Sequence, residues 1–274
     1  IHLIHPHRTD SEGCRFTDGD NNMTTAGAGV LDGRTVLVTG TGSGIGRATA
    51  KLAAAAGAFV VATDVKGQDE TVSAISDAGG KAEAHALDVT DRNAWRSVVD
   101  GVISTHGRIH GLANVAGIVS ATDSILDQTE EGWDRLLAVD LKGPFLGMQA
   151  VLPHMLDNGG GKIVNVSSTA GLIGMPNVVS YSAAKGGVIA MSRQVAIEFA
   201  ARNIRVNVVA PGVTKTSMLG DITEELLTAV TAATPAGRIG EAEDLGSAIV
   251  YLLGSTSDFI TGQVIPVDGG WTAQ

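Results

Sequence analysis

A tyrosine and a lysine four positions apart, with a serine upstream, are the residues of this sequence best suited to chemistry. On a helix, Tyr181 and Lys185 would share one face. A nearby ammonium favours the phenolate form of a tyrosine, so Tyr181 could exchange protons near neutral pH as a general acid or base. Ser168 ends a short apolar run and could hydrogen-bond a carbonyl or alcohol oxygen. The spacing is common by chance, and the alternative is an exposed tyrosine beside a solvated lysine.

Strands and helices alternate along the chain, as in a parallel sheet covered by helices on both faces. The β-branched run 35–39 predicts a buried strand, and the alanine-rich segment 47–56 predicts a helix ending at Gly57. Further strands are expected at 59–63, 81–87, 109–114, 162–166, 204–209 and 264–267. Further helices are expected at 71–78, 92–105, 133–155, 181–201 and 244–253, with a bend or a close helix contact at Gly143-Pro144. We therefore predict one α/β domain spanning residues 31–274.

A glycine-rich turn follows the first predicted strand and opens the first predicted helix. Its pattern is T-G-x-x-x-G-x-G, with glycines at Gly40, Gly44 and Gly46 around Ser43 and Ile45. Backbone N–H groups at a helix start, with no side chains in the way, can hold a pyrophosphate. Glycines also serve tight turns, so the motif alone is weak evidence for a dinucleotide site.

An acidic residue closes the second predicted strand. Asp64 lies about 20 residues beyond the glycine turn, where a carboxylate can accept hydrogen bonds from an adenosine ribose. It would repel a 2′-phosphate, position 43 is not basic, and Lys66 is the only basic candidate nearby. We therefore expect NAD rather than NADP, unless Asp64 merely caps the following turn.

Composition excludes several classes of protein. The 274 residues carry a net charge of −10, which argues against a general nucleic-acid surface. Cys14 is the only cysteine, so no internal disulfide is expected. No apolar run reaches the ~18 residues of a membrane helix. We expect a cytoplasmic location, a small-molecule substrate and no metal.

Residues 1–30 differ in pattern from the rest and are predicted to be a disordered or non-native N-terminal extension. The first methionine is Met23, so the natural start is expected near it. His2, His5 and His7 could bind a metal, but no nearby residue completes a site.

Seven motifs in order make the chain resemble the short-chain dehydrogenase/reductase family over residues 31–272. They are Thr39-Gly40-x-x-x-Gly44-Ile45-Gly46, Asp88-Val89, Asn114-x-Ala116-Gly117, Ser168, Tyr181-x-x-x-Lys185, Pro211-Gly212 and Asp268-Gly269-Gly270. The resemblance implies a Rossmann-like, doubly wound sheet of seven strands in the order 3-2-1-4-5-6-7. It also implies NAD(P)-linked hydride transfer to or from a secondary alcohol, and commonly a homotetramer.

The same resemblance implies roles for individual residues. Tyr181 would be the general acid/base, Lys185 would hold the nicotinamide ribose, and Ser168 would orient the substrate oxygen. The remaining cofactor contacts would come from Gly40, Ser43, Gly44, Ile45 and Gly46 at the pyrophosphate, Asp64 at the ribose, Asp88 and Val89 at the adenine, Asn114, Ala116 and Gly117 from the fourth strand, and Pro211, Gly212, Thr214 and Thr216 toward the carboxamide.

One position departs from the family pattern. Where the family usually has a catalytic asparagine in a V-N-L-x-G segment, this chain has Asp140 in Val139-Asp140-Leu141-Lys142-Gly143. An ionised Asp140 would pair with Lys185 and offset part of its effect on Tyr181. A neutral Asp140, or one that relays protons itself, would leave the chemistry intact. We therefore expect an active enzyme whose alcohol oxidation is shifted toward alkaline pH.

The substrate is less well specified. The segment from 212 to about 235 is expected to be a mobile lid. Apolar residues in and near the expected pocket are Leu172, Ile173, Met175, Val178, Val179, Met218, Leu219, Ile222 and Leu226. They favour an apolar pocket, although several could be packing or subunit-contact residues. A cyclic or steroid-like alcohol, a sugar or polyol, and a 3-oxoacyl thioester reduced with NADPH all stay open. A dinucleotide-binding sensor weakened by Asp140, and a structural protein, are the non-enzyme alternatives.

Overall fold

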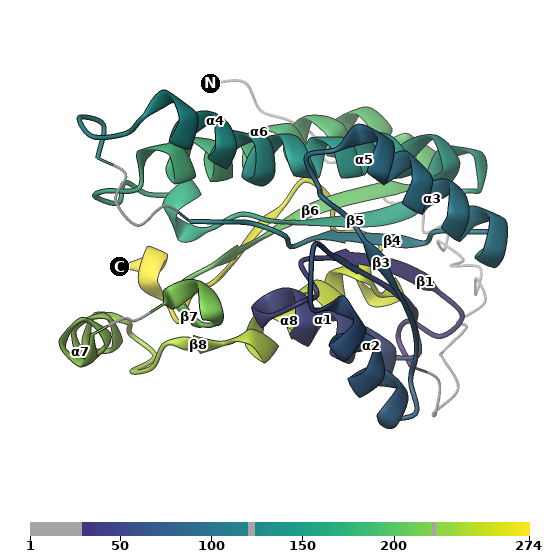
Figure 1. The fold of residues 1–274 in the computed structure, drawn as a ribbon, viewed down its shortest axis with the longest axis horizontal. Coiled ribbons are helices and arrows are strands. Elements are labelled where there is room, and N and C mark those ends of the chain that lie inside the picture. The colour runs from purple at the N-terminus through teal and green to yellow at the C-terminus, as the bar shows by residue number, and fades with distance from the viewer. Residues whose placement is uncertain (1–28, 120–123, 221–222) are drawn as a thin grey trace, which may run out of the picture.

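A twisted parallel sheet of seven strands, covered by helices on both faces, forms the centre of the molecule (Figure 1). The computed structural model describes residues 29–119, 124–220 and 223–274. The proposed N-terminal extension, its three histidines and Ile222 lie outside the described residues, except for positions 29 and 30. The strand order is β3-β2-β1-β4-β5-β6-β9, and every pairing is parallel. This confirms the predicted Rossmann-like sheet, with β9 as the seventh strand.

The strands form where apolar and β-branched residues cluster. Their bounds are β1 Thr35–Thr39, β2 Phe59–Asp64, β3 Lys81–Ala86, β4 Gly111–Asn114, β5 Gly161–Val166, β6 Ile204–Pro211 and β9 Val264–Val267. All five residues of β1 are buried, as expected for a central strand of a parallel sheet. The outer strand β3 is only partly buried.

The helices lie in two layers. On one side of the sheet are α1 Gly44–Ala55, α2 Gln68–Asp77 and α8 Ala242–Leu253 (Figure 1). On the other side are α3 Arg92–His106, α4 Glu130–Leu137, α5 Gly143–Asp157 and α6 Val179–Phe199 (Figure 1). Separate clusters of buried residues fill the two spaces between sheet and helices. No helix within the described residues has the length and apolar character to cross a membrane.

The single bent helix expected over 133–155 is three elements. Between α4 and α5 lies η1, a π-helical turn at Ala138–Lys142 that contains Asp140. Proline has no N–H, so Pro144 cannot supply the α-helical donor for the Asp140 carbonyl. The chain instead widens into a π turn, closed by the Gly143 N–H on the Ala138 carbonyl. Such turns are frequent at functional sites.

The segment expected to be a lid without secondary structure contains several elements. They are β7 Thr214–Lys215, η4 Ser217–Leu219 and α7 Glu224–Ala233. β7 pairs in parallel with β8, Gly240–Glu241, in a separate small sheet. The N-cap residue Thr223, whose hydroxyl accepts from the Leu226 N–H, explains where α7 begins. None of the α7 residues is buried, and for this reason the apolar periodicity gave little signal.

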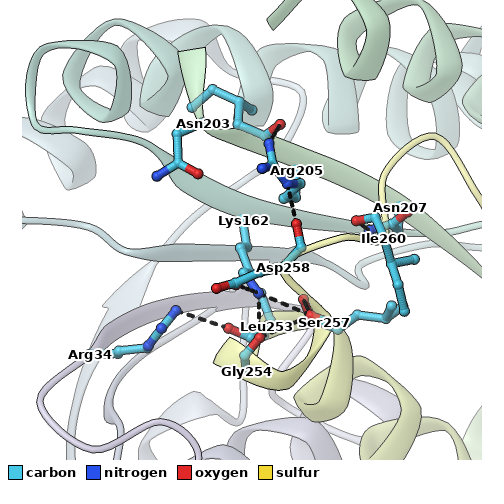
Figure 2. A network of polar contacts seen from close by, with 12 residues as sticks. Arg34, Lys162, Asn203, Arg205, Asn207, Leu253, Gly254, Ser257, Asp258 and Ile260 are labelled. Atoms are coloured by element: carbon cyan, nitrogen blue, oxygen red, sulfur yellow. Dashed lines mark hydrogen bonds and ion pairs between the residues drawn. The ribbon is translucent and has the colours of Figure 1, made fainter. Parts of the chain in front are cut away.

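At the amino-terminal edge of the sheet, a buried lysine ties β5 to the end of α8 (Figure 2). The Lys162 ammonium donates to the Gly254 carbonyl, and to the Ser257 hydroxyl at 3.0 Å. It also pairs with Asp258 at 2.6 Å, although the Asp258 side chain is 70% exposed and that of Lys162 only 8%. Burial lowers the pKa of Lys162, and the hydrogen bond to Asp258 opposes this effect.

Replacing Lys162 with methionine is expected to destabilise the fold by about 1–3 kcal/mol, because it removes buried, charge-assisted hydrogen bonds. Asp258→Asn is the matched control and should cost less than about 1 kcal/mol, because an exposed partner contributes little. Urea unfolding of both variants measures the difference. Equal destabilisation would show that the ion pair, and not the buried donor contacts, holds this edge together.

Candidate active site

Three elements meet around one buried ammonium group. Lys185 lies on α6, Asp140 on η1, and Val166 at the carboxyl end of β5. The Lys185 Nζ is 3.0 Å from Asp140 Oδ2 and donates to the Val166 carbonyl at 3.1 Å. It also lies 5.5 Å from the centre of the Tyr181 ring. The structure therefore brings together Tyr181, Lys185 and Asp140.

Neighbouring groups keep the Lys185 amine protonated. Burial by itself lowers the pKa of this amine, but the Asp140 carboxylate and the Tyr181 phenol outweigh it, so the pKa lies above its usual value. Lys185 thus stays an ammonium ion next to the phenol ring.

Asp140 is fully buried. Its Oδ1 accepts from the Ile118 N–H at 2.8 Å, while its Oδ2 faces Lys185. Gly117 lies against the pair: a Cβ there would be 2.9 Å from Asp140 Oδ2 and 3.4 Å from the Lys185 Nζ. Only glycine leaves room for the ion pair, which gives Gly117 a structural reason in addition to its predicted cofactor contact.

The two serines that follow β5, Ser167 and Ser168, make different hydrogen bonds. Ser167 donates to the Lys185 carbonyl at 2.8 Å and so fixes α6 against the sheet. Ser168 is buried, and its hydroxyl accepts from the Ala170 N–H at 3.2 Å as the N-cap of η2, Thr169–Gly171. Sequence reasoning selected Ser168 but missed Ser167, for which the only signal was its place at a strand end.

The glycine turn packs backbone against backbone. Gly40 has a φ of +74°, and a Cβ there would meet the Ala116 N at 2.8 Å, while one at Gly46 would be 2.0 Å from the Gly40 carbonyl oxygen. Thr39, a residue given no role beyond the motif, accepts from the N–H groups of Val115 and Ala116, both at 3.0 Å. These contacts bring the ends of β1 and β4 side by side.

The start of α1 carries no side-chain cap. Ser43 is its N-cap residue but makes no capping hydrogen bond, and the first turn has no acidic side chain. The Ser43 hydroxyl instead accepts from Ser217 at 3.2 Å. Gly44 has a φ of +49°, and Ile45 packs beside the buried core on the α1 side. The positive end of this helix is therefore left for an anion.

Asp64 accepts three backbone hydrogen bonds. Its Oδ2 takes the Gly42 N–H at 2.8 Å, and its Oδ1 takes those of Val65 at 2.7 Å and Lys66 at 3.3 Å. The alternative reading of Asp64 as a turn cap thus describes a real contact. Carboxylate oxygens accept more than one hydrogen bond, so this contact is compatible with ribose binding.

The other predicted cofactor residues from β3 and β4 have packing partners of their own. Asp88 accepts from the Thr90 N–H and hydroxyl, at 2.9 and 2.7 Å, and Val89 is buried beside Gly143. Asn114 donates to Asn165 Oδ1 at 2.8 Å, and Asn165 donates to the Ser192 hydroxyl at 2.8 Å. This buried network of Asn114, Asn165 and Ser192 links β4, β5 and α6, and sequence reasoning found only its first member.

The carboxyl end of β6 faces the same turn. Pro211 is the last residue of β6, and a Cβ on Gly212 would be 2.8 Å from the Asp268 Cα. Thr214 donates to the Gly212 carbonyl at 3.0 Å. The Thr216 hydroxyl caps η4 by accepting from the Met218 N–H at 3.3 Å, and its methyl group lies 3.1 Å from where Gly44 would carry a Cβ. The segment after β6 and the glycine turn after β1, which both belong to the predicted cofactor site, therefore lie side by side.

The residues present fit a dinucleotide. Gly40, Gly44 and Gly46 leave a surface of bare backbone, the α1 terminus is uncapped, and the Asp64 carboxylate lies beside the turn at Gly42. Uncapped helix N–H groups suit a pyrophosphate, and a carboxylate suits a ribose diol.

The chain is similar in sequence to known oxidoreductases. A family model described as enoyl-(acyl carrier protein) reductase matches residues 40–272. The chain is 42% identical to 3-oxoacyl-(acyl-carrier-protein) reductase of Thermotoga maritima over 243 residues, covering 88% of this chain and 98% of the relative. It is 36% identical to cyclohexanol dehydrogenase of Acinetobacter sp. strain SE19, covering 89% and 97%.

Solved structures show the same fold. A Beutenbergia cavernae protein, provisionally assigned as an NAD(P)-dependent gluconate 5-dehydrogenase with NADP bound at low occupancy, superposes with a TM-score of 0.85 at 35% identity, covering 89% of this chain and 98% of that one. Levodione reductase also gives a TM-score of 0.85, at 32% identity and with coverage of 89% and 99%. The chain thus belongs to the short-chain dehydrogenase/reductase family and is an oxidoreductase that acts on CH–OH donors.

Proposed function

We propose that this protein interconverts a secondary alcohol and a ketone with NAD(H), using Tyr181 as the general acid/base. The observation that supports this most directly is the Lys185 ammonium, buried within 5.5 Å of the Tyr181 ring centre. A positive charge in a site of low dielectric favours the phenolate, which is the form needed to accept a proton.

In the oxidation direction, the Tyr181 phenolate takes the proton of the alcohol, and in reduction the phenol returns it to the ketone oxygen. Ser168 holds that oxygen by a hydrogen bond, so that proton transfer occurs at a fixed position. Lys185 stabilises the ionised phenol and would hold the nicotinamide ribose. A bound nicotinamide dinucleotide supplies the redox chemistry.

For the cofactor, we propose NAD in preference to NADP. The support is the Asp64 carboxylate, which is fixed by the Gly42, Val65 and Lys66 N–H groups and would repel a 2′-phosphate. Asp88 and Val89 would flank the adenine, with Asn114, Ala116 and Gly117 supporting the cofactor from β4. Pro211, Gly212, Thr214 and Thr216 would line its nicotinamide end. The similar Beutenbergia cavernae protein has NADP bound, so the cofactor preference of this chain needs a direct measurement.

For the substrate, we propose an apolar, uncharged alcohol such as a cyclic one. Leu172, Ile173, Met218 and Leu226 are all exposed, in the segments that follow β5 and β6. Large apolar side chains exposed in these segments favour an apolar ligand. The runner-up is reduction of a 3-oxoacyl thioester, favoured by the Thermotoga maritima relative. We further propose a homotetramer acting in the cytoplasm, in keeping with the family and with the exposed Phe259 near the outer strand β9.

A screen of alcohols with NAD⁺ and ketones with NADH, repeated with the phosphorylated cofactors, tests substrate and cofactor together. Cyclohexanol-like alcohols with NAD⁺ are expected to give the highest kcat/KM, with NADP⁺ at least about tenfold lower because of charge repulsion at Asp64. Turnover confined to NADPH and 3-oxoacyl thioesters would replace this proposal with the runner-up.

Removing the phenolic hydroxyl tests the acid/base role. Tyr181→Phe is expected to lower kcat by about 10²–10⁴-fold, the usual contribution of general acid–base catalysis. NADH binding, followed by fluorescence titration, should stay within about twofold, because the ring and Lys185 keep their places. Tyr251→Phe is the matched control on an exposed surface and should leave kcat unchanged. A Tyr181→Phe enzyme with full kcat would assign the proton transfer to another group.

Asp140 should set the pH range of the enzyme. Its carboxylate offsets part of the Lys185 charge that the Tyr181 phenol would otherwise experience. Asp140→Asn keeps the shape and the contact with the Ile118 N–H but removes the negative charge. The rise of kcat/KM with pH for alcohol oxidation is therefore expected to move toward acid. A superimposable pH–rate curve for the parent and the variant would refute this role.

A further inference from the structure

A single guanidinium group connects the two loops that form the adenosine end of the proposed cofactor site. Arg47, on the first turns of α1, donates through Nη2 to the Gly42 carbonyl in the glycine turn. The same nitrogen reaches the Gly67 carbonyl, in the loop after β2, at 3.5 Å. Its Nε donates to the Thr71 hydroxyl on α2 at 3.0 Å. Among the described residues, no carboxylate forms an ion pair with Arg47.

The hydroxyl of Thr71 extends this connection. Thr71 is fully buried, and it donates onward to the Thr41 carbonyl at 2.7 Å. Thr41 is itself fully buried, and its N–H donates to the Thr63 carbonyl at 3.2 Å. The order Arg47, Thr71, Thr41 therefore links α1, α2 and the glycine turn. The Arg47 contacts are partly buried, and the Thr71–Thr41 hydrogen bond is shielded from water, where hydrogen bonds hold their geometry well.

The two loops touch along their backbones. A Cβ on Gly42 would be 2.1 Å from the Lys66 carbonyl oxygen, and one on Gly67 would be 3.1 Å from the Gly42 carbonyl oxygen. Gly67 also has a φ of +80°, which favours glycine. Bare backbone makes this contact, with the Asp64 carboxylate beside it, so polar groups that reach across it help to align the two loops.

Asp64 depends on this alignment. Its Oδ2 accepts from Gly42 on one loop, while its Oδ1 accepts from Val65 and Lys66 on the other. A relative shift of the loops would therefore turn the carboxylate away from the position that would bind a ribose diol.

We propose that Arg47 is a positioning residue for the adenosine end of the cofactor. It sets the preference for NAD over NADP by aligning the loops that orient Asp64, without touching the dinucleotide itself. This inference rests on the proposed function, because it concerns the same site. The guanidinium is suited to the task because its planar fork holds several donors at fixed angles, whereas the three donors of an ammonium group rotate on a flexible stem.

The test compares dinucleotide binding in variants of Arg47. Arg47→Gln and Arg47→Lys are titrated with NADH and with NADPH by fluorescence, and thermal unfolding is followed in parallel. Both variants are expected to raise the Kd for NADH by about tenfold, close to 1.4 kcal/mol. The Kd for NADPH should change by less than about twofold, since Asp64 does not favour its binding. Turnover at saturating NAD⁺ should stay within about twofold of the parent.

Two further variants serve as a charge control and as a second test of the same connection. Lys51→Gln removes one positive charge from an exposed position one turn along α1 and should leave both Kd values unchanged. Thr71→Val deletes the hydroxyl between Arg47 and Thr41 and should reproduce the loss of preference, even if Arg47→Gln folds poorly.

Several outcomes would overturn the proposal. Restoration of the parent preference by Arg47→Lys would show that charge, and not the fork, matters. An equal change in both Kd values, or a lower melting temperature with an unchanged Kd ratio, would leave Arg47 a purely structural residue. A parent protein that binds neither NADH nor NADPH would refute the proposed function itself, a result distinct from any change that appears only in the variants.

Discussion

The buried charge of Lys185 is the constraint on which the site depends. An ammonium ion removed from water is costly unless it is paired and hydrogen-bonded. Here Asp140, the Val166 carbonyl and the Tyr181 ring meet that need from three different elements. The lysine can stay charged in a buried environment only while all three elements keep their places.

Several local features follow from the same constraint. The π turn at η1 places a carboxylate in the interior where Pro144 interrupts regular helix bonding. Gly117 leaves the space that the pair occupies, and Ser167 ties the Lys185 backbone to the sheet. Asp140 forms an ion pair here, whereas an asparagine of nearly the same shape would offer only a neutral polar group. For the proposed proton transfer, this difference would concern the energetics more than the shape of the site.

At the proposed cofactor site, the loops pack against one another through their backbones and not through side chains. The loops after β1 and β2 approach through Gly42 and Gly67, and the turn at Gly40 packs on Ala116. A backbone without side chains exposes its N–H groups to an anion, but it offers few contacts that fix the position of one loop relative to the other. Arg47 and Thr71 supply those contacts, while Lys162 ties β5 to α8 at the opposite edge of the sheet.

From the sequence, local periodicity was enough to predict most strands and helices. The sheet order came from the resemblance of the ordered motifs to the family, and fixed spacings selected Tyr181, Lys185, Ser168 and the glycine turn as candidate site residues. Tertiary structure alone decided the π turn at Asp140, the helix α7, and the roles of Ser167, Asn165, Arg47 and Thr71. Each of these depends on contacts between distant segments: a serine, an asparagine or an arginine becomes a connecting residue only when folding brings its partner within hydrogen-bond distance. A surface helix such as α7 buries none of its residues, so its apolar pattern stays too weak to read.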